Sequence, residues 1–326
     1  MPTTRIDHHR HSDGPVVVGI CAQTPDLKRV LEFAAGEANN RRVDLVLVHG
    51  CSSIPTLTSL QPSVRLANRE AQWLKRLGML AEIAAEVLDP ERTVAISVHR
   101  GTGLQALVEA SASASIVVVQ RRRTSQGTRI GAGSTCVQVA RTARSPVAVL
   151  SGTEPSSPAW GNVVVGVDAT ASGSALSLAF HEAELRHTGV VAVHSWRPRP
   201  AGLFLDGSTE EEEFRRQFGE KHRAFIEYVR PWARQYPQVP LWHRLYTLPP
   251  TESLLLESTR GQLLTLGPHR RSLGSPGLGQ VTRRCLTEAS CPVLVSGGGQ
   301  RVEQPESAAS RTWSASRQSS APAGRQ

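Results

Sequence analysis

The sequence predicts an α/β protein in which one domain occurs twice in tandem. Short runs of β-branched and other apolar residues alternate with segments of helical periodicity, a pattern typical of parallel strands joined by crossover helices. The same landmarks return in the same order after 145 to 147 residues. A repeat of this length is a whole domain rather than one unit of a solenoid. We therefore expect two domains of the same architecture.

Four landmarks carry the repeat, and they keep their order and nearly their spacing. Three are strand-like runs, and the fourth is a glycine followed thirteen residues later by a proline. In the two copies they are Val16–Ile20 and Val163–Val167, Leu45–His49 and Val190–His194, Ile116–Val119 and Leu263–Leu266, and Gly133 with Pro146 and Gly279 with Pro292. This agreement indicates a duplication.

The first copy predicts five strands, at residues 16–20, 45–48, 94–98, 116–119 and 147–150. The first of these runs alternates little, as expected for a strand covered on both faces.

Helices are expected between these strands. Thr24 is the expected N-cap of the first, with Pro25 at its first helical position. A long helix precedes the third strand, and two short ones follow it at 104–112 and 136–143. The long helix is expected to turn one side toward the core, with Leu66, Glu70, Trp73, Leu74, Leu77 and Ala81 on that side.

The second copy shows the same alternation. Its long helix opens with Glu210–Glu213, whose charges favour a helix N-terminus over a metal site. The third strand, at residues 239–245, contains Pro240, which predicts a place at the edge of the sheet. The apolar residues of the long helix are interpreted as core; they are Phe214, Phe218, Phe225, Val229 and Trp232.

Composition shifts divide the chain. We expect a disordered tail at 1–14, domains at 15–151 and 161–296, a linker at 152–160, and a second disordered tail at 297–326.

The composition also excludes several classes of protein. No apolar run approaches the roughly 20 residues that cross a bilayer, and the N-terminus has no apolar stretch that could serve as a signal peptide. The five cysteines form no Cys-x-x-Cys pair, which argues against a disulfide framework or a cysteine-rich zinc site. We expect a cytoplasmic protein with no membrane partner.

The formal charge of +9 raises nucleic acid as a partner. However, only three of the 37 basic residues are lysines, and the arginines are spread along the whole chain. This pattern favours a compositional bias toward arginine with solvated side chains, so nucleic acid is not the expected partner.

The order of elements and three local motifs resemble the universal stress protein family. The motifs are Val163–Asp168 at the first strand, the Val-His pair that ends the second strand, and Cys291–Val295 after a glycine-rich turn. The resemblance covers about residues 15–151 and 161–296 and is to the tandem two-domain form. It implies two doubly wound domains, each with a five-stranded parallel sheet of order 3-2-1-4-5.

The resemblance also implies how the domains meet. In the family the last strand pairs domains or subunits along an exposed edge. The expected contact within this chain is between Val147–Leu150 and Val293–Val295, so that the two domains pack on each other. A homodimer is a second expected assembly.

Many members of this family bind ATP, and the resemblance implies a site at the carboxyl ends of the strands. An aspartate follows the first strand, and a Gly-x2-Gly-x9-Gly-(Ser/Thr) segment after the fourth strand wraps the phosphates. Its glycines allow close approach of backbone N–H groups, and its end opens a helix whose positive pole faces the anion.

The second copy keeps more of these parts. Asp168 and Gly267 are present, Arg270 stands at the second glycine, and Gly279 is followed by Gln280 instead of a hydroxyl residue. We predict a partial nucleotide site here, with ATP as ligand and Mg²⁺ accompanying it. The alternative for Asp168 is a strand-end carboxylate that caps nearby backbone.

The first copy is more degraded. Cys21 stands where the aspartate is expected, and Gln120 and Arg123 replace the two earlier glycines, so their side chains crowd the approach to phosphate. The guanidinium groups could bind phosphate instead or point into solvent. The end of the segment survives as Gly133, Ser134 and Thr135.

No motif predicts an enzyme, since the chain has no phosphate loop of the Gly-x4-Gly-Lys type, no nucleophile elbow and no His-Glu-x-x-His. His49 and His194 recur at equivalent strand ends and are interpreted as hydrogen-bonded structural residues.

The predicted function is that of a cytoplasmic regulatory binder of adenine nucleotide. Two alternatives stay open: a tandem scaffold that binds no nucleotide, and, less favoured, an anion or nucleic-acid binder that uses Arg121–Arg123 and Arg270–Arg271.

Overall fold

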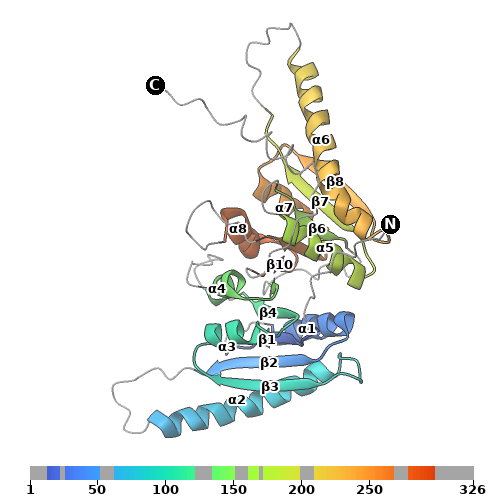
Figure 1. The fold of residues 1–326 in the computed structure, drawn as a ribbon. Helices are drawn as coiled ribbons and strands as arrows, with labels where there is room; N and C mark the ends of the chain where they lie inside the picture. The colour runs from blue at the N-terminus through green and yellow to red at the C-terminus, as the bar shows by residue number, and fades with distance from the viewer. Residues whose placement is uncertain are drawn as a thin grey trace, which may run out of the picture.

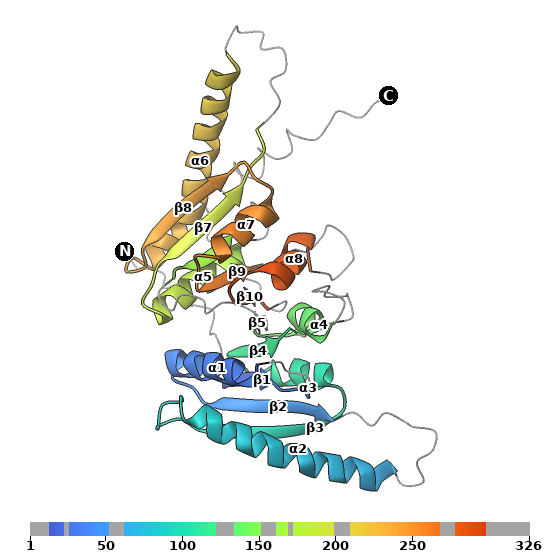
Figure 2. The same cartoon turned by 180° about the vertical axis from the view of Figure 1, so that it is seen from behind.

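The computed structural model describes residues 13–22, 26–51, 62–121, 134–150, 161–168, 172–198, 209–267 and 278–297. The predicted linker and nearly all of the two predicted tails lie outside these residues. Figures 1 and 2 show the two α/β halves stacked end to end, with the first at the bottom and the second at the top.

The first half alternates strands and helices as predicted. Its elements are β1 (Val16–Gly19), α1 (Leu27–Arg41), β2 (Leu45–Cys51), α2 (Pro62–Ala85), β3 (Val94–Arg100), α3 (Gly103–Ala110), β4 (Ile116–Gln120), α4 (Thr135–Thr142) and β5 (Val147–Leu150).

The second half repeats this order. Its elements are β6 (Val163–Gly166), α5 (Gly173–Leu185), β7 (Val190–Ser195), α6 (Glu210–Gln235), β8 (Leu241–Tyr246), α7 (Pro250–Ser258), β9 (Leu263–Leu266), α8 (Gln280–Glu288) and β10 (Val293–Val295).

The ten strands form one sheet in the order β3-β2-β1-β4-β5-β10-β9-β6-β7-β8. Each half therefore has the expected order 3-2-1-4-5, with parallel neighbours throughout. The halves join where β5 and β10 pair antiparallel, with Ala148 opposite Leu294. The expected contact between the two last strands is thus observed within one chain.

Helices cover both faces of this sheet. One buried apolar cluster lies between the sheet and α1, α2, α5 and α6, and a second lies between the sheet and α3, α4, α7 and α8. Each cluster contains residues of both halves. Inner strands such as β1, β4 and β5 are buried on both faces, which explains why their sequences alternate so little.

The observed start of α1 corrects one prediction. Asp26, not Thr24, is the N-cap, and its carboxylate accepts a hydrogen bond from the backbone N–H of Arg29 at 3.2 Å. Asp26 has non-helical φ and ψ angles of −128° and 82°, so the helix begins only after it and Pro25 precedes the helix. Thr24 and Pro25 themselves lie outside the described residues.

The predicted core faces of the two long helices were also partly wrong. Leu74 is 42% exposed, because Trp73 takes the core-facing position in that turn and the next residue of a helix lies about 100° further round the axis. Phe214, in the first turns of α6, is 39% exposed, whereas Phe225 is fully buried.

Other predictions for the second half were correct. A capping box at Thr209 and Glu212 starts α6, with Glu210–Glu213 in its first turn. Strand β8 lies at the sheet edge, directly after Pro240. The carbonyl of Pro240 still accepts the N–H of Val190 at 2.8 Å, so the proline keeps its acceptor role beside β7.

Four buried charges join α1 and α5 across the junction. Arg41 contacts Glu37 of its own helix and Glu182 of α5, and Arg186 contacts Glu182 of its own helix and Glu37 of α1. No side chain of this quartet is more than 8% exposed. The two Glu-x3-Arg pairs are 145 residues apart, so the contact has the symmetry of the duplication.

The charges of the quartet depend on one another. Burial alone would raise the pKa of Glu182, but Arg41 and Arg186 outweigh burial and lower that pKa to about 2. Burial opposes the charge of Arg186, yet Glu37 and Glu182 raise the pKa of its guanidinium. Both groups are therefore held in their charged forms.

We predict that Arg41→Ala lowers the free energy of unfolding by about 3–5 kcal/mol, because it leaves buried carboxylates without their partner. Urea unfolding of the full chain measures the change. Arg215→Ala, which removes the exposed partner of Glu211, is the control and should change stability little. Equal effects of the two variants would contradict a structural role for the quartet.

Candidate functional site

A pocket opens in the second half where the sheet reverses its winding. Strands β6 and β9 are neighbours, and their crossovers pass to opposite sides of the sheet, which is where open α/β sheets hold ligands. The cavity has a volume of about 340 Å³. It is lined by the carboxyl ends of β6, β7 and β9 and by the first residues of α7 and α8.

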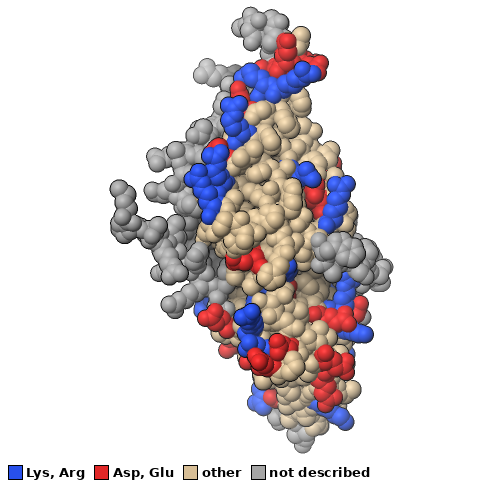
Figure 3. All heavy atoms as spheres, turned by 90° about the vertical axis from the view of Figure 1, so that its right-hand side faces the viewer, with Lys and Arg blue, Asp and Glu red and all other residues tan. Residues whose placement is uncertain are grey.

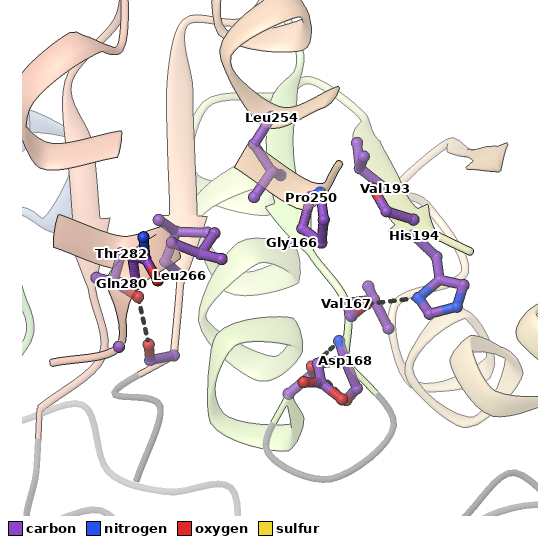
Figure 4. Close-up of a pocket in the computed structure, with 15 residues that line it drawn as sticks. Gly166, Val167, Asp168, Val193, His194, Pro250, Leu254, Leu266, Gln280 and Thr282 are labelled. Atoms are coloured by element: carbon purple, nitrogen blue, oxygen red, sulfur yellow. Dashed lines mark hydrogen bonds between the residues drawn. The ribbon is translucent and has the colours of Figure 1, made fainter. Parts of the chain in front are cut away.

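Asp168 lies at one side of this pocket, two residues after the end of β6 (Figure 4). The Ser172 hydroxyl accepts the backbone N–H of Asp168 and donates to its carbonyl at 2.6 Å. Because Ser172 closes onto both backbone groups, the end of the strand is held in place. Ser172 thus caps the backbone at the end of β6, and the two roles considered for the Asp168 side chain stay predictions.

The start of α8 lies at the other side, where Figure 4 shows Gln280 and Thr282 across the cavity from Asp168. Gly279 is the N-cap, and no side chain caps this end. The N–H groups of Gln280, Val281 and Thr282 have no intrahelical partner, because the first residues of a helix lack one. These groups and the helix dipole make this side of the pocket attractive to an anion.

Gly267 directly follows β9 and also lines the pocket. Its carbonyl accepts the hydroxyl of Thr282 at 3.3 Å, which ties the end of the strand to the first turn of α8. The absence of side chains at Gly267 and Gly279 allows a ligand to approach the backbone closely.

Apolar side chains form the remaining wall. Val193, Pro250, Leu254 and Leu266 face the cavity, and Figure 4 shows Leu254 and Pro250 together on one side of it. The pocket therefore combines an apolar wall, a carboxylate and an anion-attracting helix start. Such a combination suits a ligand with a flat apolar part and a phosphate.

His194 also lines the pocket, and its role matches the sequence interpretation. Its Nδ1 lies 2.9 Å from the carbonyl oxygen of Val167, and Nδ1 of His49 lies 2.8 Å from that of Ile20. Burial lowers the pKa of His49, so its neutral form is favoured. Both histidines tie the ends of two adjacent strands together.

The structure brings four of the predicted site residues together, namely Asp168, Gly267, Gly279 and Gln280. Arg270 and Gly133 lie outside the described residues. Ser134 and Thr135 lie at the start of α4 in the first half, as N-cap and first helical residue. The roles of all these residues in binding stay predictions.

Sequence reasoning missed several residues that line the pocket. Ser172, Ser195, Pro250 and Thr282 belong to no part of the glycine-rich motif. A usable signal was their position, since each lies at the carboxyl end of a predicted strand or at the start of the helix that follows one.

The sequence profile of the universal stress protein family matches residues 14–151 and 159–296. The chain belongs to the universal stress protein family. The two matches together span most of the chain, and each contains one complete half of the fold.

Individual relatives agree with this assignment. A universal stress protein of Mycolicibacterium smegmatis is 28% identical over 86% of this chain and 96% of its own length. One of Mycobacterium tuberculosis H37Rv is 30% identical over 72% of this chain and 71% of its own length. The crystal structure of a universal stress protein from Archaeoglobus fulgidus is similar with a TM-score of 0.62 at 15% identity, covering 89% of this chain and 99% of that one.

Two other universal stress proteins were solved in complex with dAMP and cAMP. Each covers 42% of this chain, with TM-scores of 0.29 and 0.33. Fits this low say nothing about the ligand of the present chain.

The residue equivalent to Gly267 in the first half of this universal stress protein carries a side chain that reaches a helix. Gln120, 147 residues before Gly267, is 7% exposed, and its Oε1 accepts the N–H of Asp26 at 3.4 Å. The side chain thus spans from the end of β4 to the start of α1. That it crowds the approach of a phosphate stays a prediction.

Arg121 has a role in this universal stress protein that the sequence did not predict. It is 5% exposed, and its Nη1 donates to the carbonyl oxygens of Leu286, at 2.7 Å, and Thr287 in the last turn of α8. A residue of the first half therefore caps a helix of the second, at its negative pole.

The position of Arg121 removes it from any surface that could bind nucleic acid. Figure 3 shows basic side chains interspersed with acidic ones in both halves of the face that it draws. Within the described residues, no helix is both long and apolar enough to cross a membrane.

We predict that Arg121→Ala lowers the free energy of unfolding by about 2–3 kcal/mol, because buried charge-assisted hydrogen bonds at the end of α8 are lost. Urea unfolding measures it. Arg284→Ala, on the same helix but in an exposed pair with Glu288, is the matched control and should leave the midpoint nearly unchanged. A midpoint shift of equal size in both variants would argue against the capping role.

Proposed function

We propose that this universal stress protein is a regulatory binder of adenine nucleotide, with ATP bound in the pocket of its second half. The observation that carries the proposal is the arrangement of Asp168 and the uncapped start of α8 on opposite sides of one cavity of about 340 Å³. That volume lies within the range of small-molecule sites. Membership of the family supports the choice of ligand class.

The residues present fit a nucleotide. The N–H groups at the start of α8 would hold phosphate oxygens, with Gly267 and Gly279 leaving the backbone accessible. Leu254 and Val193 would pack on the flat apolar base, and Asp168 would accept hydrogen bonds from hydroxyl groups of the sugar. Mg²⁺ would enter with the triphosphate as one complex.

We propose one nucleotide per chain. In the first half the side chain of Gln120 reaches from the end of β4 to the start of α1, whereas Gly267 at the equivalent position of the second half lines an open pocket. The proposal is one of binding without turnover, so that occupancy rather than hydrolysis acts on a partner.

We also propose the reducing cytoplasm as the compartment. The structure places none of the five cysteines in a disulfide, and four of them are buried. Cysteines outside disulfides are typical of proteins in reducing compartments. Recovery of the protein in a secreted fraction would contradict this location.

Asp168→Ala should weaken ATP binding about tenfold to a hundredfold, because it removes an acceptor of ligand hydrogen bonds. Isothermal titration calorimetry on the full chain measures the dissociation constant and the stoichiometry. Cys21→Ala, at the equivalent position of the first half, is the control and should have no effect. Equal small effects of both variants would contradict the asymmetry, and no binding by the wild-type chain would leave the scaffold alternative.

Gln280→Pro tests the anion-binding side of the pocket. Proline is tolerated at the first position of a helix but has no N–H, so ATP binding should weaken about tenfold while the fold is kept. Gln280→Ala keeps the N–H and is the matched control. Adenosine, which lacks phosphate, should bind the proline variant and the wild-type chain equally. Loss of adenosine binding as well would mean that the pocket itself has changed.

A further inference from the structure

Helix α2 lies at the outer end of the first half, beyond β2 and β3 in both ribbon views (Figures 1 and 2). Its buried side packs Leu77, Leu80 and Ala84 against the sheet. Large apolar residues also occur on its other side, where Met79 is 59% exposed and Ile83 is 39% exposed. A helix that only covers a sheet needs a single apolar stripe, on the side that faces the sheet. The exposed apolar residues on the other side of α2 therefore indicate a further contact.

The corresponding helix of the second half differs. The outer side of α6 carries ion pairs one turn apart, such as Arg215 with Glu211 and Arg216 with Glu220. These pairs are exposed and typical of a helix surface in water. Helix α6 also exposes one large apolar side chain, Phe214, but its ring packs against those of Trp196 and Phe218. The internal comparison is therefore between the apolar Met79 and Ile83 of α2 and the ion pairs on the outer side of α6.

The stripe follows the spacing of a helix-packing seam. Arg76, Met79 and Ile83 belong to α2, and Glu86 directly follows its last residue. The separations are three, four and three residues, and all four residues are exposed. Spacings of three and four that alternate place side chains along one line that a second helix can contact. The guanidinium carbon of Arg76 lies 5.0 Å from the centroid of the Trp73 ring, a cation–π contact that restricts the position of the Arg76 charge.

Charge is distributed with opposite signs along the same helix. The basic residues Lys75 and Arg76 precede Met79, whereas the acidic Glu82 directly precedes Ile83 and the acidic Glu86 directly follows the helix. A parallel copy would place like charges together. An antiparallel copy would place each basic end against an acidic end, so the surface is complementary to itself.

We propose that this face of α2 is the contact between two copies of the chain, related by a two-fold axis that passes between Met79 and Ile83. In an antiparallel pair the axis places Met79 opposite Ile83 and Arg76 opposite Glu86. Each contact occurs twice, as two-fold symmetry requires. The occupant of the apolar stripe is thus a second copy of this chain, and the charges set its direction.

Charge reversal at the seam tests the proposal. Arg76→Glu and Glu86→Arg should each raise the dimer dissociation constant about tenfold, because each places like charges opposite one another twice. The double variant R76E/E86R should restore the wild-type constant, since the pairs are then opposite in sign again. Sedimentation equilibrium of the full chain measures these constants.

Two further variants complete the design. Met79→Glu should abolish the dimer, and Arg223→Glu, the same charge change on exposed α6, should leave it unchanged. Circular dichroism and thermal melting show whether each variant is folded. A wild-type chain that stays monomeric at about 100 μM, a dimer that the seam variants do not weaken, or a double variant that does not recover would each overturn the proposal.

Discussion

The buried quartet of Glu37, Arg41, Glu182 and Arg186 constrains the whole molecule. Each carboxylate is balanced only when both halves are in place, because each arginine bridges one glutamate of its own helix and one of the other. Separation of the halves would leave these charges either exposed to solvent or buried without a partner. A buried charge without a partner costs about 3–5 kcal/mol of stability. The quartet lies on one face of the sheet, while Arg121 joins the halves through α8. The pairing of β5 with β10 is thus supported by polar contacts that fit only one arrangement.

The same duplication has produced two unlike ends of the fourth strand. Gln120, the last residue of β4, spans to α1, whereas Gly267, directly after β9, lines a cavity. Arg121, the next residue in the first half, contacts α8 across the junction. Gln120 and Arg121 thus serve the structure of the first half and its junction, while the corresponding end of β9 opens onto the pocket.

Most of the fold was predictable because it rests on local patterns. Apolar runs and the repeat located all ten strands, and the edge position of β8 followed from Pro240. The pocket was predictable in outline, since Asp168 and Gly279 follow or precede elements that meet at one sheet edge. The quartet was not predicted, although its Glu-x3-Arg pairs repeat in the sequence, because an ordinary surface helix carries the same spacing. The contact of Arg121 depends on packing between halves, which no local pattern encodes.

The antiparallel pairing of β5 with β10 also affects how readily the protein aggregates when its two halves separate. One sheet of ten strands has two outer edges, β3 and β8, where two separate sheets would have four. The two outer edges carry basic or titratable side chains, such as Arg100 and Arg244, which discourage edge-to-edge association. The inner edges, β5 and β10, consist of buried valine, leucine and alanine. Opening of the junction would therefore expose two apolar strand edges that can pair with other chains in amyloid-like assembly. The association of the two halves thus also protects the chain against aggregation.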